Sequence, residues 1–203
     1  MENERIASLK PLAIITGKLM LITVLSAVLL ACINLITEPI IAANESSKKN
    51  AAVLQLFPDA TDIYQMNEAS ADAYPDGISE VFSVYKAGTF VGCCIVSEAM
   101  GFGDNISTMV GVGADSRVIG IRVLSIAETP GIGMAAAEQT YLDSYIGLAF
   151  PVTFEDGANH ADAITGATYS SRAIRDAVNL ALEYSTQITP QTSDTETEGS
   201  VNE

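Results

Sequence analysis

An uncharged apolar run near the N-terminus constrains this chain more than any other feature. It extends from Leu19 to Ile36 and contains no Asp, Glu, Lys, Arg or His. At about 1.5 Å per residue, a helix of this length just crosses a hydrocarbon core of ~30 Å. Lys18 can extend its amine to the interface, so the helix can begin a turn or two earlier. The sequence therefore predicts a transmembrane helix over residues 12–37, after a short cytoplasmic segment of residues 1–11.

Two other interpretations of the same run stay open. A cleaved signal peptide requires small residues at a cleavage site, and the residues after Ile36 do not form one. Leu29–Cys32 resembles a lipoprotein processing site with Cys32 as the lipidated residue, although the apolar run continues beyond it. A retained anchor agrees best with the length of the run. All three interpretations place the rest of the chain on the outer side of a membrane.

Basic residues on the two sides of the run predict its orientation. Arg5, Lys10 and Lys18 precede or border it, and Lys48 and Lys49 follow it. Loops rich in Lys and Arg stay in the cytoplasm. We therefore expect a single-pass protein of the cell (inner) membrane, with its N-terminus in the cytoplasm and its large domain on the extracytoplasmic side.

The composition of the whole chain excludes several classes of protein. With 25 acidic against 10 basic residues, the chain lacks the clustered positive charge that nucleic acid requires. One His and three Cys form neither a metal-ligand nor a haem-attachment pattern. Cys93 and Cys94 are neighbours, so on a strand they point to opposite faces, and we predict that both are core residues. Any redox group is therefore organic or belongs to a partner.

The pattern of apolar residues predicts one compact α+β domain over residues 61–188. A membrane-proximal helix is expected over 38–60, with a new start at Thr37–Pro39 and a break at Pro58. A helix with an apolar stripe is expected over Tyr169–Tyr184. Four strands joined by tight turns are expected at Ser79–Tyr85, Thr89–Val96, Ile106–Gly111 and Val118–Ile126. The fold class is thus one transmembrane helix followed by a small antiparallel sheet with flanking helices, and residues 189–203 are predicted to be a disordered acidic tail.

The segment Asp162–Ser171 leads directly into the predicted C-terminal helix. It combines an extended piece, a turn at Gly166 and hydroxyl residues at the helix start, where Thr168 or Ser170 is expected to be the N-cap. The free N–H groups and the positive end of the helix dipole favour an anion such as a phosphate. From these residues alone, an ordinary helix cap remains the simpler interpretation.

A second segment, Glu128–Gly133, follows a predicted strand and reads Glu-Thr-Pro-Gly-Ile-Gly. A Pro-Gly turn with two glycines lets backbone approach a flat ligand, and Thr129 can hydrogen-bond a ring edge. Such a turn occurs in many proteins, so by itself it does not identify a ligand site.

Taken together, the two segments resemble the FMN-binding domain family. Residues 162–168, Asp-Ala-Ile-Thr-Gly-Ala-Thr, are similar to its flavinylation motif, and residues 128–133 are similar to the loop that lies against the flavin ring. The resemblance implies FMN linked by a phosphoester to Thr168, attached by a separate flavin transferase that uses FAD as donor. The implied cofactor-binding residues are Thr168, Ala167, Gly166, Thr165, Glu128, Thr129, Gly131, Ile132 and Gly133.

Within this family, the anchor, the length and the single flavin domain look most like the G subunit of Rnf-type complexes. The C subunit of the Na⁺-translocating NADH:quinone reductase shares the motifs but is usually longer. The resemblance implies an electron carrier in a complex that couples ferredoxin:NAD electron transfer to Na⁺ or H⁺ translocation. Its expected partners are an iron–sulfur-bearing pair of membrane subunits and a second flavin subunit, so it would not be an enzyme by itself.

Two alternatives differ in their predictions. A stand-alone flavinylated protein that relays electrons to extracellular acceptors would share every motif, whereas a binding protein without flavin would stay colourless beside a flavin transferase. Among the other polar residues, we expect His160 to be a solvated loop residue. Arg172 and Arg175 are expected to pair with the many carboxylates in preference to a phosphate.

Overall fold

The fold is described from a computed structural model, which covers residues 2–66, 74–128 and 133–188, with residues 2–14 and 42 described by their backbone alone. The chain divides into two units, residues 1–48 and 49–203. The predicted tail over residues 189–203 lies outside the described residues.

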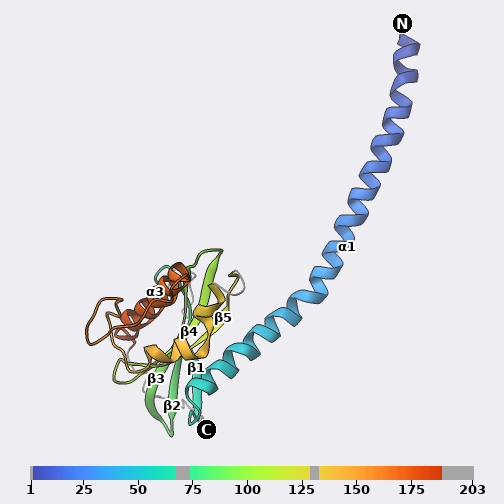
Figure 1. The fold of residues 1–203 in the computed structure, drawn as a ribbon. Helices are drawn as coiled ribbons and strands as arrows, with labels where there is room; N and C mark the ends of the chain where they lie inside the picture. Colours follow the sequence, from blue (N-terminus) through green and yellow to red (C-terminus); the bar gives the residue numbers. More distant parts are fainter. Residues whose placement is uncertain (1, 67–73, 129–132, 189–203) are drawn as a thin grey trace, which may run out of the picture. The chain divides into compact units, whose positions relative to one another are not determined.

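The N-terminal helix α1 is continuous from Glu2 to Leu56 (Figure 1). The prediction that a new helix starts at Thr37–Pro39 is therefore wrong. Thr37 Oγ1 donates to the Ile33 carbonyl over 2.8 Å, and Asn34 Nδ2 donates to Glu38 Oε2 over 3.5 Å, so side chains support the turn in which Pro39 supplies no N–H. The stretch Ile15–Leu56 is long and apolar enough to cross a membrane, by length and composition.

The domain is built on an antiparallel sheet in which each strand pairs with the next along the chain, in the order β1-β2-β3-β4-β5. Its strands are β1 Asp62–Gln65, β2 Ile78–Lys86, β3 Thr89–Met100, β4 Asn105–Gly113 and β5 Val118–Ser125. The four predicted strands are confirmed. The short edge strand β1 was not predicted, because its polar residues show no apolar period and become a strand only by pairing with β2.

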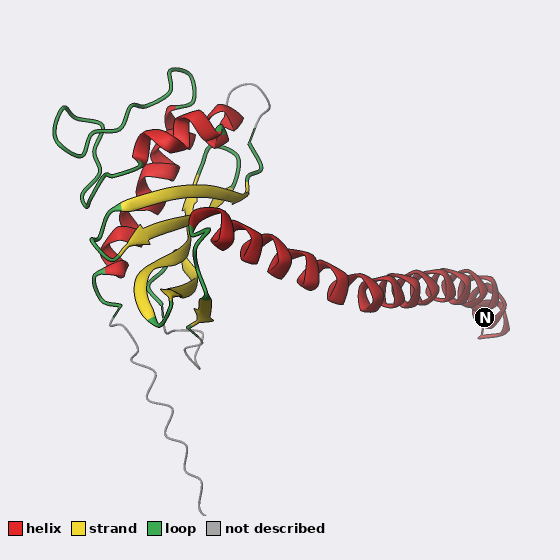
Figure 2. Ribbon diagram, turned by 90° about the horizontal axis from the view of Figure 1, so that it is seen from below, coloured by secondary structure: helices red, strands yellow, loops and turns green. Residues whose placement is uncertain are grey.

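Both faces of the sheet are buried, which explains the nearly continuous apolar runs in β3 and β4. One face packs against α3 (Thr168–Ser185) and against short helical turns, η1 Gly133–Ala137, α2 Gln139–Leu142 and η2 Asp143–Tyr145. The other face packs against Ala52, Val53 and Leu56 in the last turns of α1. Figure 2 shows helices lying against the strands of the sheet. Cys93 belongs to the first cluster and Cys94 to the second, so the prediction that both are core residues is confirmed.

Helix α3 confirms the predicted helix and begins one residue earlier, at Thr168. Its N-cap is Ala167, so the prediction that Thr168 or Ser170 caps it is wrong. The chain turns at Gly166 and enters the helix immediately, which places Thr168 and Ser170 inside the first turn. Ser97 Oγ of β3 donates to the Ala177 carbonyl over 2.9 Å and holds α3 on the sheet.

Candidate functional site

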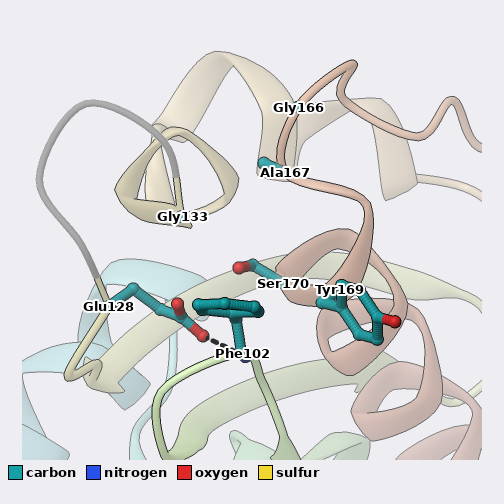
Figure 3. Close-up of a pocket in the computed structure, with 7 residues that line it drawn as sticks. All are labelled: Phe102, Glu128, Gly133, Gly166, Ala167, Tyr169 and Ser170. Carbon is teal, nitrogen blue, oxygen red and sulfur yellow. Dashed lines mark hydrogen bonds between the residues drawn. The ribbon is translucent and has the colours of Figure 1, made fainter.

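A cavity of about 360 Å³ lies beside the start of α3. The size is within the range of small-molecule sites. Three segments far apart in the sequence form it: the connection between β3 and β4, the end of the β5 segment with the start of η1, and the turn into α3 (Figure 3). Its lining residues are Phe102, Glu128, Gly133, Gly166, Ala167, Tyr169 and Ser170.

The turn into α3 forms one wall of the cavity. Gly166 has a φ of +88°, a conformation that strains any residue with a Cβ, and Ala167 follows as a buried N-cap. Ala167 makes no side-chain cap hydrogen bond. The first N–H groups of a helix have no partner within the helix and carry a partial positive charge, so this wall suits an anion. Ser170 is buried, and its hydroxyl points toward the cavity (Figure 3).

Thr168 lies between two lining residues, Ala167 and Tyr169, and its side chain is exposed. Thr165, in the preceding turn, is exposed as well. Thr168 is therefore an exposed residue next in sequence to the cavity lining, on a helix end that the core holds in place.

Two side-chain contacts order the segment before Thr168. Ile164 N–H donates to the buried Ser171 Oγ over 3.1 Å. His160 bonds Asp162 Oδ1 through Nε2 and the Glu155 carbonyl through Nδ1, each over 3.0 Å. The hydrogen bond with Asp162, and then the one with Glu155, raises the pKa of His160 above its ordinary value. His160 is therefore a partly exposed loop residue, as predicted, and it also orders the motif segment.

Glu128 forms the opposite wall and is 7% exposed. Its Oε1 accepts the Phe102 N–H over 2.6 Å and the Gly103 N–H over 3.4 Å. Its Oε2 is buried and has no hydrogen-bond partner among the described residues. A Cβ at Gly101 would lie 2.1 Å from Oε1, and one at Gly133 would lie 2.6 Å from Oε2, so both glycines make room for this carboxylate.

Two exposed aromatic rings border the cavity. Phe102 is 71% exposed and Tyr169 is 62% exposed, and their ring centroids are 5.9 Å apart with an interplanar angle of 56°. The sequence-based reasoning did not identify Phe102, Tyr169 or Ser170 as site residues. Phe102 could have been noticed in the sequence because it stands between Gly101 and Gly103. A large aromatic residue between two glycines in a short connection is placed where it cannot pack into the core.

Several residues predicted from the sequence thus meet in space. The same cavity is lined by Glu128 and Gly133 from one segment and by Gly166 and Ala167 from another, more than 30 residues further along the chain. Thr165 and Thr168 do not line it but are adjacent in sequence to residues that do. Thr129, Gly131 and Ile132 lie outside the described residues. Arg175 pairs with Asp176 over 2.6 Å, as expected for an arginine among many carboxylates.

The cavity lies within a segment of the chain that is similar to a known protein family. Residues 101–183 match the model of the FMN-binding domain. This part of the chain is therefore similar to the FMN-binding domain family. The matched segment contains the Phe102 connection, Glu128 and the whole turn into α3, so all three walls of the cavity lie within residues 101–183.

Curated relatives cover most of the chain. It is 26% identical over 179 residues to the G subunit of the proton-translocating ferredoxin:NAD(+) oxidoreductase complex of Clostridium ljungdahlii, covering 86% of this chain and 92% of the relative. It is 25% identical over 181 residues to the G subunit of the Na(+)-translocating complex of Acetobacterium woodii, covering 81% and 87%. The G subunit of the ion-translocating oxidoreductase complex of Stutzerimonas stutzeri is 29% identical, with 87% and 82% covered.

Among solved structures, the chain is similar to NqrC of Shewanella oneidensis. The TM-score is 0.49 at 19% sequence identity, and the alignment covers 63% of this chain and 81% of that one.

Proposed function

We propose that this chain is the electron-carrying subunit of an Rnf-type membrane complex, with FMN held by a phosphoester on Thr168. The complex would couple ferredoxin:NAD electron transfer to the translocation of Na⁺ or H⁺. The proposal covers either ion, because relatives named for proton and for sodium translocation match at 26% and 25% identity.

One observation carries this proposal: Gly166 and Ala167 of the motif line a cavity within the segment that matches the FMN-binding domain, and the next residue, Thr168, is exposed. The walls agree with the chemistry of FMN. Phe102 and Tyr169 offer flat apolar surface to a ring system. The start of α3, without a side-chain cap, offers N–H groups to a phosphate. Glu128 offers a buried acceptor to a ring N–H.

Attachment would form one P–O bond and break another. The Thr168 oxygen bonds to the phosphorus of the FMN half of FAD, AMP leaves, and the hydroxyl proton is released. A separate flavin transferase would catalyse this step, for which the exposure of Thr168 is a requirement. Once attached, FMN supplies the redox chemistry, while the residues of this chain fix its position and its surroundings.

The apolar helix α1 supports an anchor in the cell membrane. In the proposed topology, the N-terminus lies in the cytoplasm and the FMN-binding domain on the outer side, where a covalent link prevents loss of the cofactor by dilution. The proposed electron donor is an iron–sulfur centre of neighbouring membrane subunits, and the proposed acceptor is a second flavin subunit.

The test is intact mass of the full-length protein and of Thr168→Ala, each made together with an active flavin transferase, with in-gel flavin fluorescence alongside. We expect an added FMN mass in the wild type and in Thr168→Ser, and none in Thr168→Ala. Retention of attached flavin in Thr168→Ala would move the site to Thr165 or Ser170. No added mass in any variant, with a control substrate fully loaded, would overturn the proposal.

A second experiment separates a component of a complex from a stand-alone flavoprotein. A tagged full-length chain is purified in mild detergent from cells that express the other Rnf-type proteins. Co-purification of iron–sulfur-bearing membrane subunits supports the proposed partners, and isolation of a lone, fully flavinylated chain contradicts them.

A further inference from the structure

The two oxygens of Glu128 have different surroundings. Oε1 accepts two backbone N–H groups of the β3–β4 connection, whereas the buried Oε2 has no partner in the described part of the chain. A buried acceptor without a donor costs about 1–3 kcal/mol, and more when it is charged. Gly101 and Gly133 nevertheless keep space for both oxygens. A side chain that only braced the connection would need Oε1 alone.

The place of Glu128 in the cavity lining indicates which group can donate a hydrogen bond to Oε2. Glu128 is a lining residue of the cavity that also contains Phe102 and the start of α3, and Figure 3 shows its carboxylate beside the Phe102 ring. A ring lying against Phe102 therefore brings its edge to Glu128. An oxidised isoalloxazine carries one N–H donor, the imide N3–H of its pyrimidine edge.

We propose that Glu128 Oε2 accepts a hydrogen bond from the flavin N3–H, and that this carboxylate lowers the reduction potential of the bound flavin. The inference rests on the proposed function and deepens it. Each electron that enters the ring without a proton adds one negative charge, and a carboxylate at the ring edge opposes that charge. Burial strengthens the effect, because charges interact more strongly away from water.

Glu128 is the one Asp or Glu among the described residues that line the cavity, and Lys and Arg do not occur among them. Among the described residues, the N–H groups of Phe102 and Gly103 donate to this carboxylate, so backbone dipoles balance part of its charge. Glu128 acts in this proposal as a positioning and tuning residue.

The test compares two substitutions that each remove one carboxylate charge. Glu128→Gln removes the buried charge and keeps an oxygen for the Phe102 N–H. Asp104→Asn removes an exposed charge in the same connection, where Asp104 Oδ1 accepts the Asn105 N–H over 2.7 Å. The midpoint potential of each full-length flavinylated protein is measured by spectroelectrochemical titration. We expect a positive shift for Glu128→Gln that clearly exceeds the shift for Asp104→Asn. Equal potentials for the two variants would overturn the tuning role.

A second readout follows the proposed hydrogen bond directly. Flavin labelled with ¹⁵N is attached to the wild-type chain, and the N3–H proton is followed by NMR. We expect a downfield resonance that exchanges slowly with water, and its loss in Glu128→Ala. A rapidly exchanging N3–H in the wild type would overturn the hydrogen bond. Intact mass is recorded for every sample: no adduct anywhere contradicts the proposed function, whereas an adduct with an unprotected N3–H contradicts only this inference.

Discussion

Two walls of the cavity, the one at Glu128 and the one at the start of α3, differ in how the protein surrounds them. Glu128 is only 7% exposed, and its carboxylate is packed against Gly101 and Gly133. The wall at the start of α3 ends in an exposed Thr168 beside an exposed Tyr169. One cavity therefore combines a closed side with an open side.

The difference matches two separate requirements. A group that another protein must modify has to be accessible, so a hydroxyl at the exposed end of a helix is suitable. A group that sets the electrostatics of a cofactor acts most strongly where water is excluded. Variants in and near the two walls should consequently differ in their free energy of unfolding. The effect should be largest at Gly133 and smallest at His160, in the segment before the turn into α3.

Gly133→Ala tests how tightly the closed wall is packed. The new Cβ would lie 2.6 Å from Glu128 Oε2 and 2.7 Å from Glu128 Cβ, so the free energy of unfolding should fall by about 1–3 kcal/mol. The measurement is urea unfolding of the full-length protein in detergent, followed by near-UV circular dichroism. Gly157→Ala is the matched control, since its nearest heavy atom is 4.0 Å away. Equal unfolding midpoints for the two variants would show that the closed wall adapts easily.

Ser171→Ala tests the buried contact beneath the open wall. Removing Oγ leaves the Ile164 N–H without its 3.1 Å acceptor, so we expect a loss of about 1 kcal/mol in the same unfolding experiment. Ser144→Ala is the control, because its Oγ bonds the Tyr141 carbonyl at an exposed position and its loss should cost less. A wild-type midpoint for Ser171→Ala would mean that the motif segment is ordered by other contacts.

Thr168→Ala tests whether the exposed hydroxyl contributes to the fold. The N-cap is Ala167, so the apo protein should keep its free energy of unfolding within about 0.5 kcal/mol. The comparison is made on chains produced without flavin transferase. A loss above ~1 kcal/mol would indicate that Thr168 caps the helix after all.

His160 provides the smallest effect and the one that depends on pH. Its pKa is raised chiefly by the hydrogen bond with Asp162, so protonation favours the folded state. The stabilising contribution is complete below the ordinary histidine pKa of 6.5 and is lost as the pH rises through the raised value. NMR titration of this single histidine should show the raised pKa in the wild type and a lower one in Asp162→Asn. An unchanged pKa in that variant would exclude Asp162 as the main cause.

Local patterns account for the parts of the fold that were predicted correctly. Four strands follow from apolar residues between tight turns, and α3 follows from an apolar stripe at helical spacing. The strand β1 and the continuity of α1 through Pro39 were not predicted. β1 depends on its partner β2, and the turn before Pro39 depends on side-chain bonds that residue type alone does not reveal.

The site shows the same division. The motif residues 165–168 and the residues Glu128 and Gly133 were predicted from the resemblance of two short segments to the FMN-binding domain family. Phe102, Tyr169 and Ser170 were not, because a ring or a hydroxyl becomes part of a cavity only through what lies opposite to it. Phe102 and Tyr169 are 5.9 Å apart in space although they come from the β3–β4 connection and from α3.

The sequence by itself determined the apolar span of α1, the antiparallel hairpins, the C-terminal helix and the segment that carries Thr168. These features depend on periodicity and turn residues within short windows of the chain. Only the tertiary structure decided that Ala167, and not a hydroxyl residue, caps α3, and that one oxygen of Glu128 is bonded while the other is buried without a partner among the described residues. The physical reason is that burial and hydrogen-bond partnership depend on contacts between distant segments, which form only when the sheet and α3 pack together.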